Sequence, residues 1–315
     1  MIQKLLFILT GFFALGFTHG ETPVFVFETG KEITNVNTQT PPGDSILTCL
    51  KITRDIRIKN YFQFMDSLVA AVDTFNNWDL DEYILVHANS WLIDSLRATD
   101  YYALIERGIF VYDQREMVIL HKGDSLAIPD SAYTSSIQKK LQSTVVDVNI
   151  PEFILRIYQS NDTILTCPVR VGRDERKYIY VIKRVLDLKT PIGVGEIIRV
   201  DRMHKVINLD TGKPYPGTNR DDGKFTKMPL IPWIEPSING IQYGAMIHPT
   251  TNPSTLGKAY SHGCVGTTEA DAWTIYYNAP VGTKVIFRYD LEIVDAKGNT
   301  IMLKDIYGLK GGIKD

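Results

Sequence analysis

The sequence predicts an α+β protein whose second half is mostly β. Its composition is that of an ordinary globular chain, with 44% apolar and 22% charged residues, and 315 residues suffice for two domains. The first half mixes amphipathic helical segments with short strand candidates. After Pro151 the chain consists of apolar, β-branched runs separated by Gly, Pro and Asn. We therefore expect a smaller α+β region of unknown role over residues 21–146, a mostly-β domain over residues 147–289, and a hairpin and tail over residues 290–315.

The first twenty residues have the pattern of a secretory signal peptide. Lys4 supplies a positive charge and residues 5–15 form an apolar run. Thr18 and Gly20 then place small side chains ahead of a cleavage site before Glu21. The run is shorter than the roughly 20 apolar residues that a membrane span needs, although a retained anchor is the alternative. We expect an exported protein of the periplasm or cell envelope, with no stable membrane insertion after cleavage.

Hydrophobic periodicity predicts the elements that precede the mostly-β domain. They are an extended lead-in with one or two strands up to residue 60, a helix over residues 66–76, two short helices within 91–107, and strands over 109–112 and 117–121. Thr99 is a suitable N-cap for the second short helix, and Gly108 is a suitable stop.

The second half is expected to be built from strands and one helix. The predicted elements are a hairpin of residues 153–159 and 163–171, strands over 178–188, 196–200 and 284–289, a helix over 269–277, and a hairpin turn at 296–299. The sequence Ser160-Asn161-Asp162 provides the turn residues of the first hairpin. Ala270, Trp273 and Tyr277 recur at helical spacing.

Charge and cysteine content exclude two classes of protein. Lys and Arg number 34 against 36 Asp and Glu, so the formal net charge is −2, whereas nucleic-acid-binding domains are normally basic. The three cysteines, Cys49, Cys167 and Cys264, cannot form a disulfide framework. An odd count also leaves at least one thiol unpaired within the chain.

The segment from His248 to Cys264 concentrates the residues that suit nucleophilic catalysis. Cys264 follows small and polar residues and precedes a predicted helix, and a nearby imidazole favours the reactive thiolate. His248 and His262 are candidate bases. Gly263 allows close backbone approach, so backbone N–H groups around it could form an oxyanion hole.

Simpler interpretations of these residues remain open. A lone cysteine is most often a buried structural residue. His248, His262 and Cys264 could also supply zinc ligands, but no fourth ligand stands at a familiar spacing. Cys49 and Cys167 have no histidine nearby, so structural roles or a mutual disulfide are expected for them. We expect no metal.

The pattern Ser261-His262-Gly263-Cys264-Val265, with an upstream histidine in Ile247-His248-Pro249, resembles the active-site signature of the L,D-transpeptidase catalytic domain family, also called YkuD-like. Two further segments are similar to the family. They are Lys189-Thr190-Pro191-Ile192-Gly193, which matches its Thr-Pro-x-Gly segment, and the hairpin ending in Val171-Gly172. The resemblance covers roughly residues 147–289 and implies two packed sheets in a β-sandwich-like domain.

The resemblance also implies roles for individual residues. Cys264 would be the nucleophile and His248 the general acid/base, oriented here by a backbone carbonyl because Pro249 follows it. His262 would shape the site and Gly263 would contribute to the oxyanion hole. Ser261 and Tyr260 are expected to contact substrate.

The reaction implied by the family is acyl transfer on peptidoglycan stem peptides without a cofactor. Cys264 would attack the carbonyl of the third residue of a tetrapeptide stem and release D-alanine, and an amine would then resolve the thioester as a 3→3 cross-link. Water as acceptor would make the enzyme an L,D-carboxypeptidase, and a protein lysine would tether a wall protein. A carbapenem-type β-lactam is the expected covalent inhibitor.

The chain departs from the family at Gly266, where members usually have Asn or Arg. Recognition of a substrate carboxylate must then come from elsewhere, and Arg173, Arg176 and Arg184 are unranked candidates. A non-catalytic wall-binding module is the alternative that Gly266 supports. A cysteine peptidase of unrelated fold is disfavoured because no histidine follows Cys264.

Overall fold

The computed structural model describes residues 26–28, 48–73, 79–208, 211–295 and 297–310, and it divides the chain into two compact units. The described residues up to Leu92, together with Arg115–Lys139, form the first unit, and Ile93–Gln114 with the described residues from Lys140 onward form the second. The expected signal peptide lies outside the described residues. Within them, no helix combines the length and the apolar character that crossing a membrane requires.

The first unit is built around helix α1 (Ile58–Asp73). Tyr61, Met65, Leu68 and Val72 are buried at helical spacing, so one face of α1 faces the core. The helix begins at Ile58 rather than at residue 66 because Ile58 and Tyr61 extend the same apolar stripe. The last predicted residues of this helix lie outside the described residues.

Short strands and further helices complete the first unit. Its strands form a sheet of β1 (Val26–Glu28), β2 (Thr48–Lys51) and β5 (Ser125–Ile128), and a pair of β3 (Ile56–Arg57) and β4 (Val118–Leu120). Helices α2 (Glu82–Ala88) and α5 (Ser131–Gln142) were not predicted. Asp81 caps α2, because its carboxylate accepts a hydrogen bond from the Ile84 N–H at 2.7 Å.

The two short helices expected within residues 91–107 are confirmed as α3 (Trp91–Arg97) and α4 (Tyr101–Glu106). The N-cap of α4 is Asp100, not Thr99: the Asp100 carboxylate accepts the N–H groups of Tyr102 and Ala103. Gly108 follows the helix with φ +76°, a conformation that glycine adopts without strain.

The strand predicted at residues 109–112 is wrong. These residues form no strand, and Ile109, Phe110 and Tyr112 are exposed. The Ile109 N–H donates to the Leu104 carbonyl and the Tyr112 carbonyl accepts from the Lys227 N–H, so these residues make single backbone contacts rather than a strand ladder, and composition alone misled the prediction. The polar turn that follows contains the 3-10 helix η1 (Gln114–Glu116).

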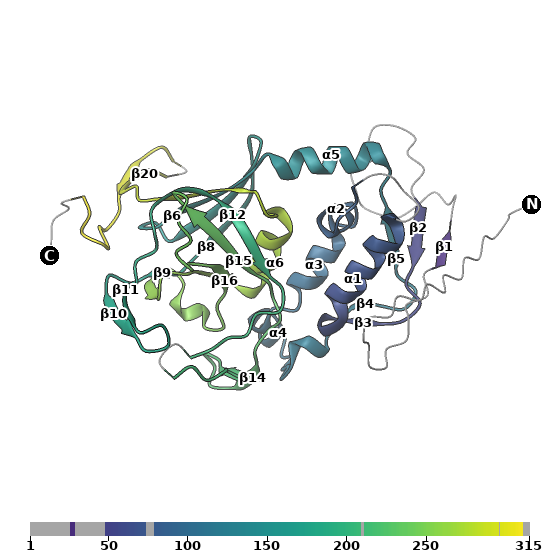
Figure 1. Cartoon of the computed structure of the whole chain (residues 1–315), viewed down its shortest axis with the longest axis horizontal. Coiled ribbons are helices and arrows are strands. Elements are labelled where there is room, and N and C mark those ends of the chain that lie inside the picture. Colours follow the sequence, from purple (N-terminus) through teal and green to yellow (C-terminus); the bar gives the residue numbers. More distant parts are fainter. Residues whose placement is uncertain (1–25, 29–47, 74–78, 209–210, 296, 311–315) are drawn as a thin grey trace, which may run out of the picture. The chain divides into compact units, whose positions relative to one another are not determined.

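The second unit contains an eight-stranded mixed sheet. Its order is β18 (Val265–Thr267), β16 (Ile247–Pro249), β15 (Trp233–Ile238), β12 (Gly193–Asp201), β19 (Lys284–Arg288), β6 (Thr144–Asn149), β7 (Ile154–Gln159) and β8 (Asp162–Pro168). The pairs β16–β18 and β19–β6 are parallel and the others antiparallel. Helix α6 (Glu269–Asn278) follows β18 directly and packs on β16 (Figure 1).

Shorter strand pairs surround this sheet. They are β9 (Val171–Gly172) with β17 (Ala259–Ser261), β10 (Arg176–Ile179) with β11 (Arg184–Asp187), β13 (Gly217–Asn219) with β14 (Phe225–Lys227), and β20 (Glu292–Val294) with β21 (Thr300–Met302). The 3-10 helix η2 (Pro253–Thr255) lies between β16 and β17 in the chain.

Most of the predicted strands of the second half are confirmed. The hairpin of β7 and β8, the strands β12 and β19, helix α6 and the C-terminal hairpin all occur where expected. The single strand predicted over 178–188 is instead the hairpin β10–β11, which turns where Lys183 adopts φ +52°. Strand β6 was not predicted. The expected fold class, α+β with a mostly-β second part, is confirmed.

Candidate active site

Two adjacent strands at one edge of the large sheet carry His248 and the residues after Cys264. Strands β16 and β18 are parallel, and their register pairs His248 with Gly266. Paired residues of adjacent strands point to the same face of a sheet, as do residues two apart in one strand. His248, Gly266 and Cys264 therefore belong to one face, and the structure brings the predicted base and nucleophile to the same edge.

The Cys264 thiol lies against the strand that carries His248. Its Sγ accepts a hydrogen bond from the Met246 N–H at 3.4 Å, and the Val265 N–H donates to the Met246 carbonyl at 2.9 Å. Burial raises the pKa of the Cys264 thiol, while the Met246 N–H and the charge of Arg170 lower it. The resting form is therefore the neutral thiol, which needs a base or a positive charge to become a nucleophile.

His248 is buried and its ring is held on two sides. Its Nδ1 lies 2.8 Å from the Pro249 carbonyl oxygen, and its ring stacks on Trp233 with centroids 4.1 Å apart. A carbonyl only accepts, so Nδ1 carries the proton and Nε2 is the basic nitrogen. Burial, and next the charge of Arg170, lower the pKa of His248 to about 3. The backbone carbonyl expected as its orienting partner is the one that Pro249 provides.

The side chain of Ser261 holds the turn between β17 and β18. The Ser261 hydroxyl donates to the Cys264 carbonyl at 2.6 Å and accepts the Gly263 N–H at 3.2 Å. Gly263 adopts φ +111°, which side chains other than glycine rarely tolerate. The Gly263 N–H is thus engaged within the turn, whereas the Cys264 N–H has no acceptor in the described part of the chain.

Thr190, in the segment similar to Thr-Pro-x-Gly, is hydrogen-bonded to this turn. Its hydroxyl donates to the Gly263 carbonyl at 3.0 Å and accepts the Gly172 N–H at 2.8 Å. The Tyr307 hydroxyl donates to the Gly172 carbonyl at 2.6 Å and accepts the Thr190 N–H at 3.1 Å. A side chain at position 172 would overlap the Leu188 carbonyl oxygen, so this close approach requires glycine. No sequence pattern predicted a role for Tyr307.

The remaining predicted residues lie at the exposed side of the turn. His262 is exposed, and its Nε2 is 3.1 Å from Nη2 of Arg173, which also pairs with Glu175 at 2.9 Å. Tyr260 is 56% exposed. Arg176 and Arg184 lie on the hairpin β10–β11. Of the three arginines proposed from the sequence, Arg173 is the one that contacts a residue of the motif.

Arg170 is a further residue of the site that no sequence pattern indicated. It is paired with Gly266 across an antiparallel bridge, and its charge acts on both Cys264 and His248. No local pattern indicates its position, because nearly a hundred residues of chain separate Arg170 from Gly266.

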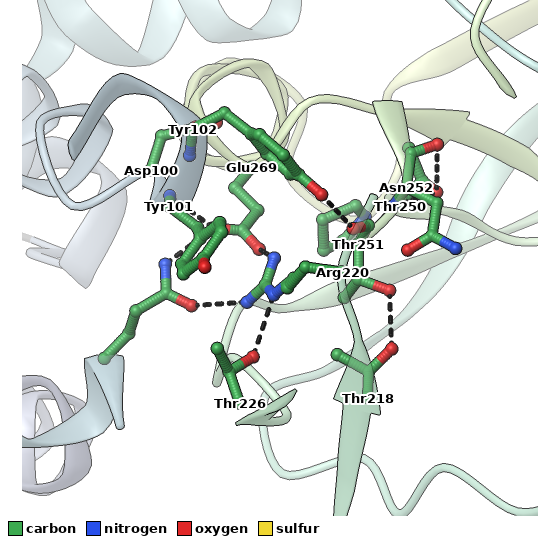
Figure 2. A network of polar contacts seen from close by, with 12 residues as sticks. Asp100, Tyr101, Tyr102, Thr218, Arg220, Thr226, Thr250, Thr251, Asn252 and Glu269 are labelled. Atoms are coloured by element: carbon green, nitrogen blue, oxygen red, sulfur yellow. Dashed lines mark hydrogen bonds and ion pairs between the residues drawn. The ribbon is translucent and has the colours of Figure 1, made fainter. Parts of the chain in front are cut away.

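A buried polar network supports the loop after His248 (Figure 2). Arg220 and Glu269, the first residue of α6, form an ion pair at 2.5 Å, and both side chains are almost fully buried. Gln114 accepts from Arg220 at 2.9 Å and donates to Glu269 at 2.6 Å. The neighbouring Tyr102 hydroxyl donates to the Thr251 carbonyl at 3.0 Å (Figure 2). Residues from the first half of the sequence thus help to fix the chain that leaves β16.

Comparison with known proteins identifies this region. Residues 143–287 match the family model of the L,D-transpeptidase catalytic domain, YkuD. The resemblance expected from the sequence is thereby confirmed. The matched residues include Cys264, His248, Thr190, Gly266 and Arg170.

Individual relatives of the domain come from several bacteria. The YkuD protein of Bacillus licheniformis is 27% identical over 163 residues, which are 52% of this chain and 73% of that protein. An L,D-transpeptidase from Mycobacterium smegmatis is 14% identical, covers 46% of this chain and 58% of its own, and has a TM-score of 0.33. L,D-transpeptidase 3 from Mycobacterium tuberculosis, solved with a faropenem-derived adduct, is 17% identical with a TM-score of 0.32, over 46% and 60% of the chains. The chain thus spans about three fifths of these solved structures.

Proposed function

We propose that the chain is a peptidoglycan L,D-transpeptidase in which Cys264 is the nucleophile. The observation that carries the proposal is the β16–β18 edge, where a thiol and a histidine with a free Nε2 share one face within the L,D-transpeptidase domain. The match of this domain to its family supports the substrate class. The non-catalytic module that Gly266 suggested has less support, because Cys264 and His248 lie on neighbouring segments at one edge of the sheet and hydrogen bonds order the turn before Cys264.

The first half of the proposed reaction forms a thioester. The Cys264 Sγ transfers its proton to Nε2 of His248 and attacks the carbonyl carbon of the third residue of a tetrapeptide stem. The Cys264 N–H, which has no other acceptor in the described segments, donates to the resulting oxyanion. The C–N bond then breaks, and the departing D-alanine amine takes the proton from His248.

The second half transfers the acyl group to an acceptor amine. The amine of a second stem attacks the thioester carbonyl and gives its proton to His248, and Cys264 leaves and is reprotonated. The product is a 3→3 cross-link. Water in place of the amine would give an L,D-carboxypeptidase, and a protein lysine would tether a protein to the wall. In each case Ser261 and Gly263 keep the shape of the turn, and His262 and Tyr260 line its exposed side.

The reaction requires export, because its substrate lies outside the cytoplasmic membrane. We propose that residues 1–20 are a signal peptide and that the mature protein begins at Glu21 and works in the periplasm or cell envelope. N-terminal sequencing of the exported protein should then start at Glu21. Recovery of the uncleaved chain in the membrane fraction would instead support a retained anchor.

Mass spectrometry of stem peptides tests the activity. The purified protein, incubated with tetrapeptide stems, should release D-alanine and form cross-linked dimers, whereas tripeptides alone would indicate the carboxypeptidase. Cys264→Ala should abolish both products. Cys49→Ala, a matched thiol deletion outside the domain, should leave them unchanged.

A carbapenem provides a second test that needs no peptide substrate. The intact protein should gain the mass of one carbapenem, and peptide mapping should place it on Cys264. An adduct on Cys49 or Cys167 would show that the nucleophile is wrongly assigned. Absence of both product release and adduct in a folded protein would contradict the proposed function.

A further inference from the structure

Arg170 lies on a third strand segment beside the two that carry His248 and Cys264. The Arg170 N–H donates to the Gly266 carbonyl and the Gly266 N–H donates to the Arg170 carbonyl, both at 2.9 Å. This is a hydrogen-bonded antiparallel pair, in which opposite side chains point to the same face. Because Gly266 is also paired with His248, the Arg170 side chain belongs to the face that carries His248 and Cys264.

The absence of a side chain at Gly266 makes room for the side chain of Arg170. A Cβ atom built on Gly266 would lie 2.5 Å from Nε, 2.7 Å from Cγ and 3.0 Å from Cδ of Arg170. Two of these distances are below any normal contact and the third is at its limit. The Arg170 side chain therefore crosses directly over Gly266, and any larger residue there would displace it.

The Arg170 guanidinium is held without a compensating negative charge. Its Nε is completely buried and has no hydrogen-bond partner, and Nη1 makes a single long contact of 3.4 Å with the Thr255 hydroxyl. No carboxylate in the described segments forms an ion pair with it. A cation in such surroundings costs free energy, as the burial-lowered pKa of Arg170 indicates, unless an anion shares the site.

We propose that Arg170 is a positioning residue that supplies the positive charge stabilising the Cys264 thiolate, and that Gly266 is required so that its side chain can reach that place. The thiolate is the anion that the uncompensated guanidinium lacks. Arg170 also disfavours a second positive charge on His248, so the base remains neutral and ready to accept the thiol proton.

The other charged and titratable groups around the thiol do not supply this charge. Glu235, on β15, opposes thiolate formation and is itself bound by Arg199 at 2.7 Å. His248 on β16 and His204, which stacks on Trp233, both have pKa values lowered by burial and are neutral at pH 7. On β17, Tyr260 is exposed, and beyond it the exposed His262 contacts Arg173.

The proposal rests on Cys264 being the nucleophile, but it can be tested without any peptide substrate. The rate of alkylation of Cys264 by iodoacetamide, measured by peptide mapping between pH 6 and 10, reports the thiolate fraction. Arg170→Met should shift the pH profile upward by about one unit, which is about tenfold in rate at a fixed pH below the midpoint. Arg170→Lys should shift it less.

Exchanging the two residues gives the sharpest comparison. Gly266→Ala keeps Arg170 but displaces it, so it should resemble Arg170→Met. The double variant Arg170→Gly/Gly266→Arg returns a guanidinium to the same face from the opposite strand and should recover at least part of the lost rate relative to Arg170→Gly. Lys284→Met, which removes one positive charge from an exposed position of β19, should leave the profile unchanged.

The outcomes separate this inference from the proposed function. An unshifted profile in folded Arg170→Met would overturn the inference even if D-alanine release is normal. If Arg170→Met does not fold, as judged by thermal unfolding, an unshifted profile in Gly266→Ala decides in the same way. A shifted profile in a protein that never releases D-alanine would uphold the inference about the thiol and contradict the proposed reaction.

Discussion

At the scale of single residues, burial decides the protonation state of the candidate catalytic pair. Burial lowers the pKa of His248 and raises that of Cys264, so both groups are neutral near pH 7. The pair is a thiol and an imidazole at rest rather than a preformed ion pair. Substrate and the Arg170 charge must then favour proton transfer at the moment of reaction.

The lowered pKa of His248 predicts a loss of stability in acid. Between the ordinary value of 6.5 and about 3, the unfolded chain binds a proton at His248 and the folded chain does not. The free energy of unfolding should therefore fall as pH decreases from about 6.5, by about 1–2 kcal/mol at pH 5. Urea denaturation at pH 7 and pH 5 measures it. The difference should shrink in His248→Gln, and an equal difference in both proteins would contradict the assignment.

Trp233 is predicted to act through the ring of His248. The two rings are stacked at 17°, and among the described residues no carboxylate is hydrogen-bonded to the imidazole. Trp233→Leu should lower kcat for D-alanine release about tenfold, because the ring loses a planar neighbour that restricts its rotation. Trp233→Phe keeps an aromatic face and should retain most activity. If both variants lose activity equally while remaining folded, stacking on the His248 ring does not explain the loss of kcat.

At the scale of elements, the cysteine turn depends on segments far away in the chain. Thr190 precedes β12, Gly172 ends β9 and Tyr307 lies in the C-terminal segment, yet hydrogen bonds link all three. The Thr190 hydroxyl connects them to the cysteine turn by donating to the Gly263 carbonyl. The C-terminal segment is thus part of the support of the candidate site.

Removing the Tyr307 hydroxyl tests this support. Tyr307→Phe leaves the buried Gly172 carbonyl and Thr190 N–H without their partner, so the free energy of unfolding should fall by about 1–3 kcal/mol. Tyr178→Phe, at an exposed position, is the control and should have almost no effect. Carbapenem adduct formation at Cys264 should also slow in Tyr307→Phe. An unchanged adduct rate would show that the hydrogen bonds of the Tyr307 hydroxyl do not influence the geometry of the cysteine turn.

At the scale of the whole molecule, the second unit recruits residues from the first half of the sequence. Gln114, Tyr101 and Asp100 bind Glu269 or the first turn of α6, and Arg220 completes the buried charges (Figure 2). Residues 93–114 therefore belong to the same compact unit as residues 143–287, which match the family model.

The buried ion pair predicts a large effect from a single substitution. Glu269→Ala leaves the fully buried Arg220 without its carboxylate, which should cost about 3–5 kcal/mol of unfolding free energy. Glu292→Ala, on the exposed β20, should change stability little. Thermal and urea unfolding of the two variants measure the difference. A small cost for Glu269→Ala would mean that water or another residue replaces the carboxylate.

Local sequence patterns were sufficient wherever an element contains its own signal. The turn residues at Ser160–Asp162 and the spacing of Trp273 and Tyr277 correctly placed a hairpin and a helix. Helices α2 and α5 were missed, and residues 109–112 were wrongly assigned as a strand. Helices α2 and α5 do carry local signals, since the carboxylates of Asp81 and Asp130 accept N–H groups of their first turns, whereas at residues 109–112 apolar composition alone does not make a strand.

The residue types from His248 to Cys264 are enough to predict a site with a thiol and a histidine, because these residues lie close together in the chain. The three-dimensional fold alone sets which other residues stand beside them. Arg170, Trp233 and Tyr307 are distant in the chain and reach the site through strand register, ring stacking and close backbone approach. Such contacts form only when the strands pair and the side chains pack together without water, so no local pattern encodes them.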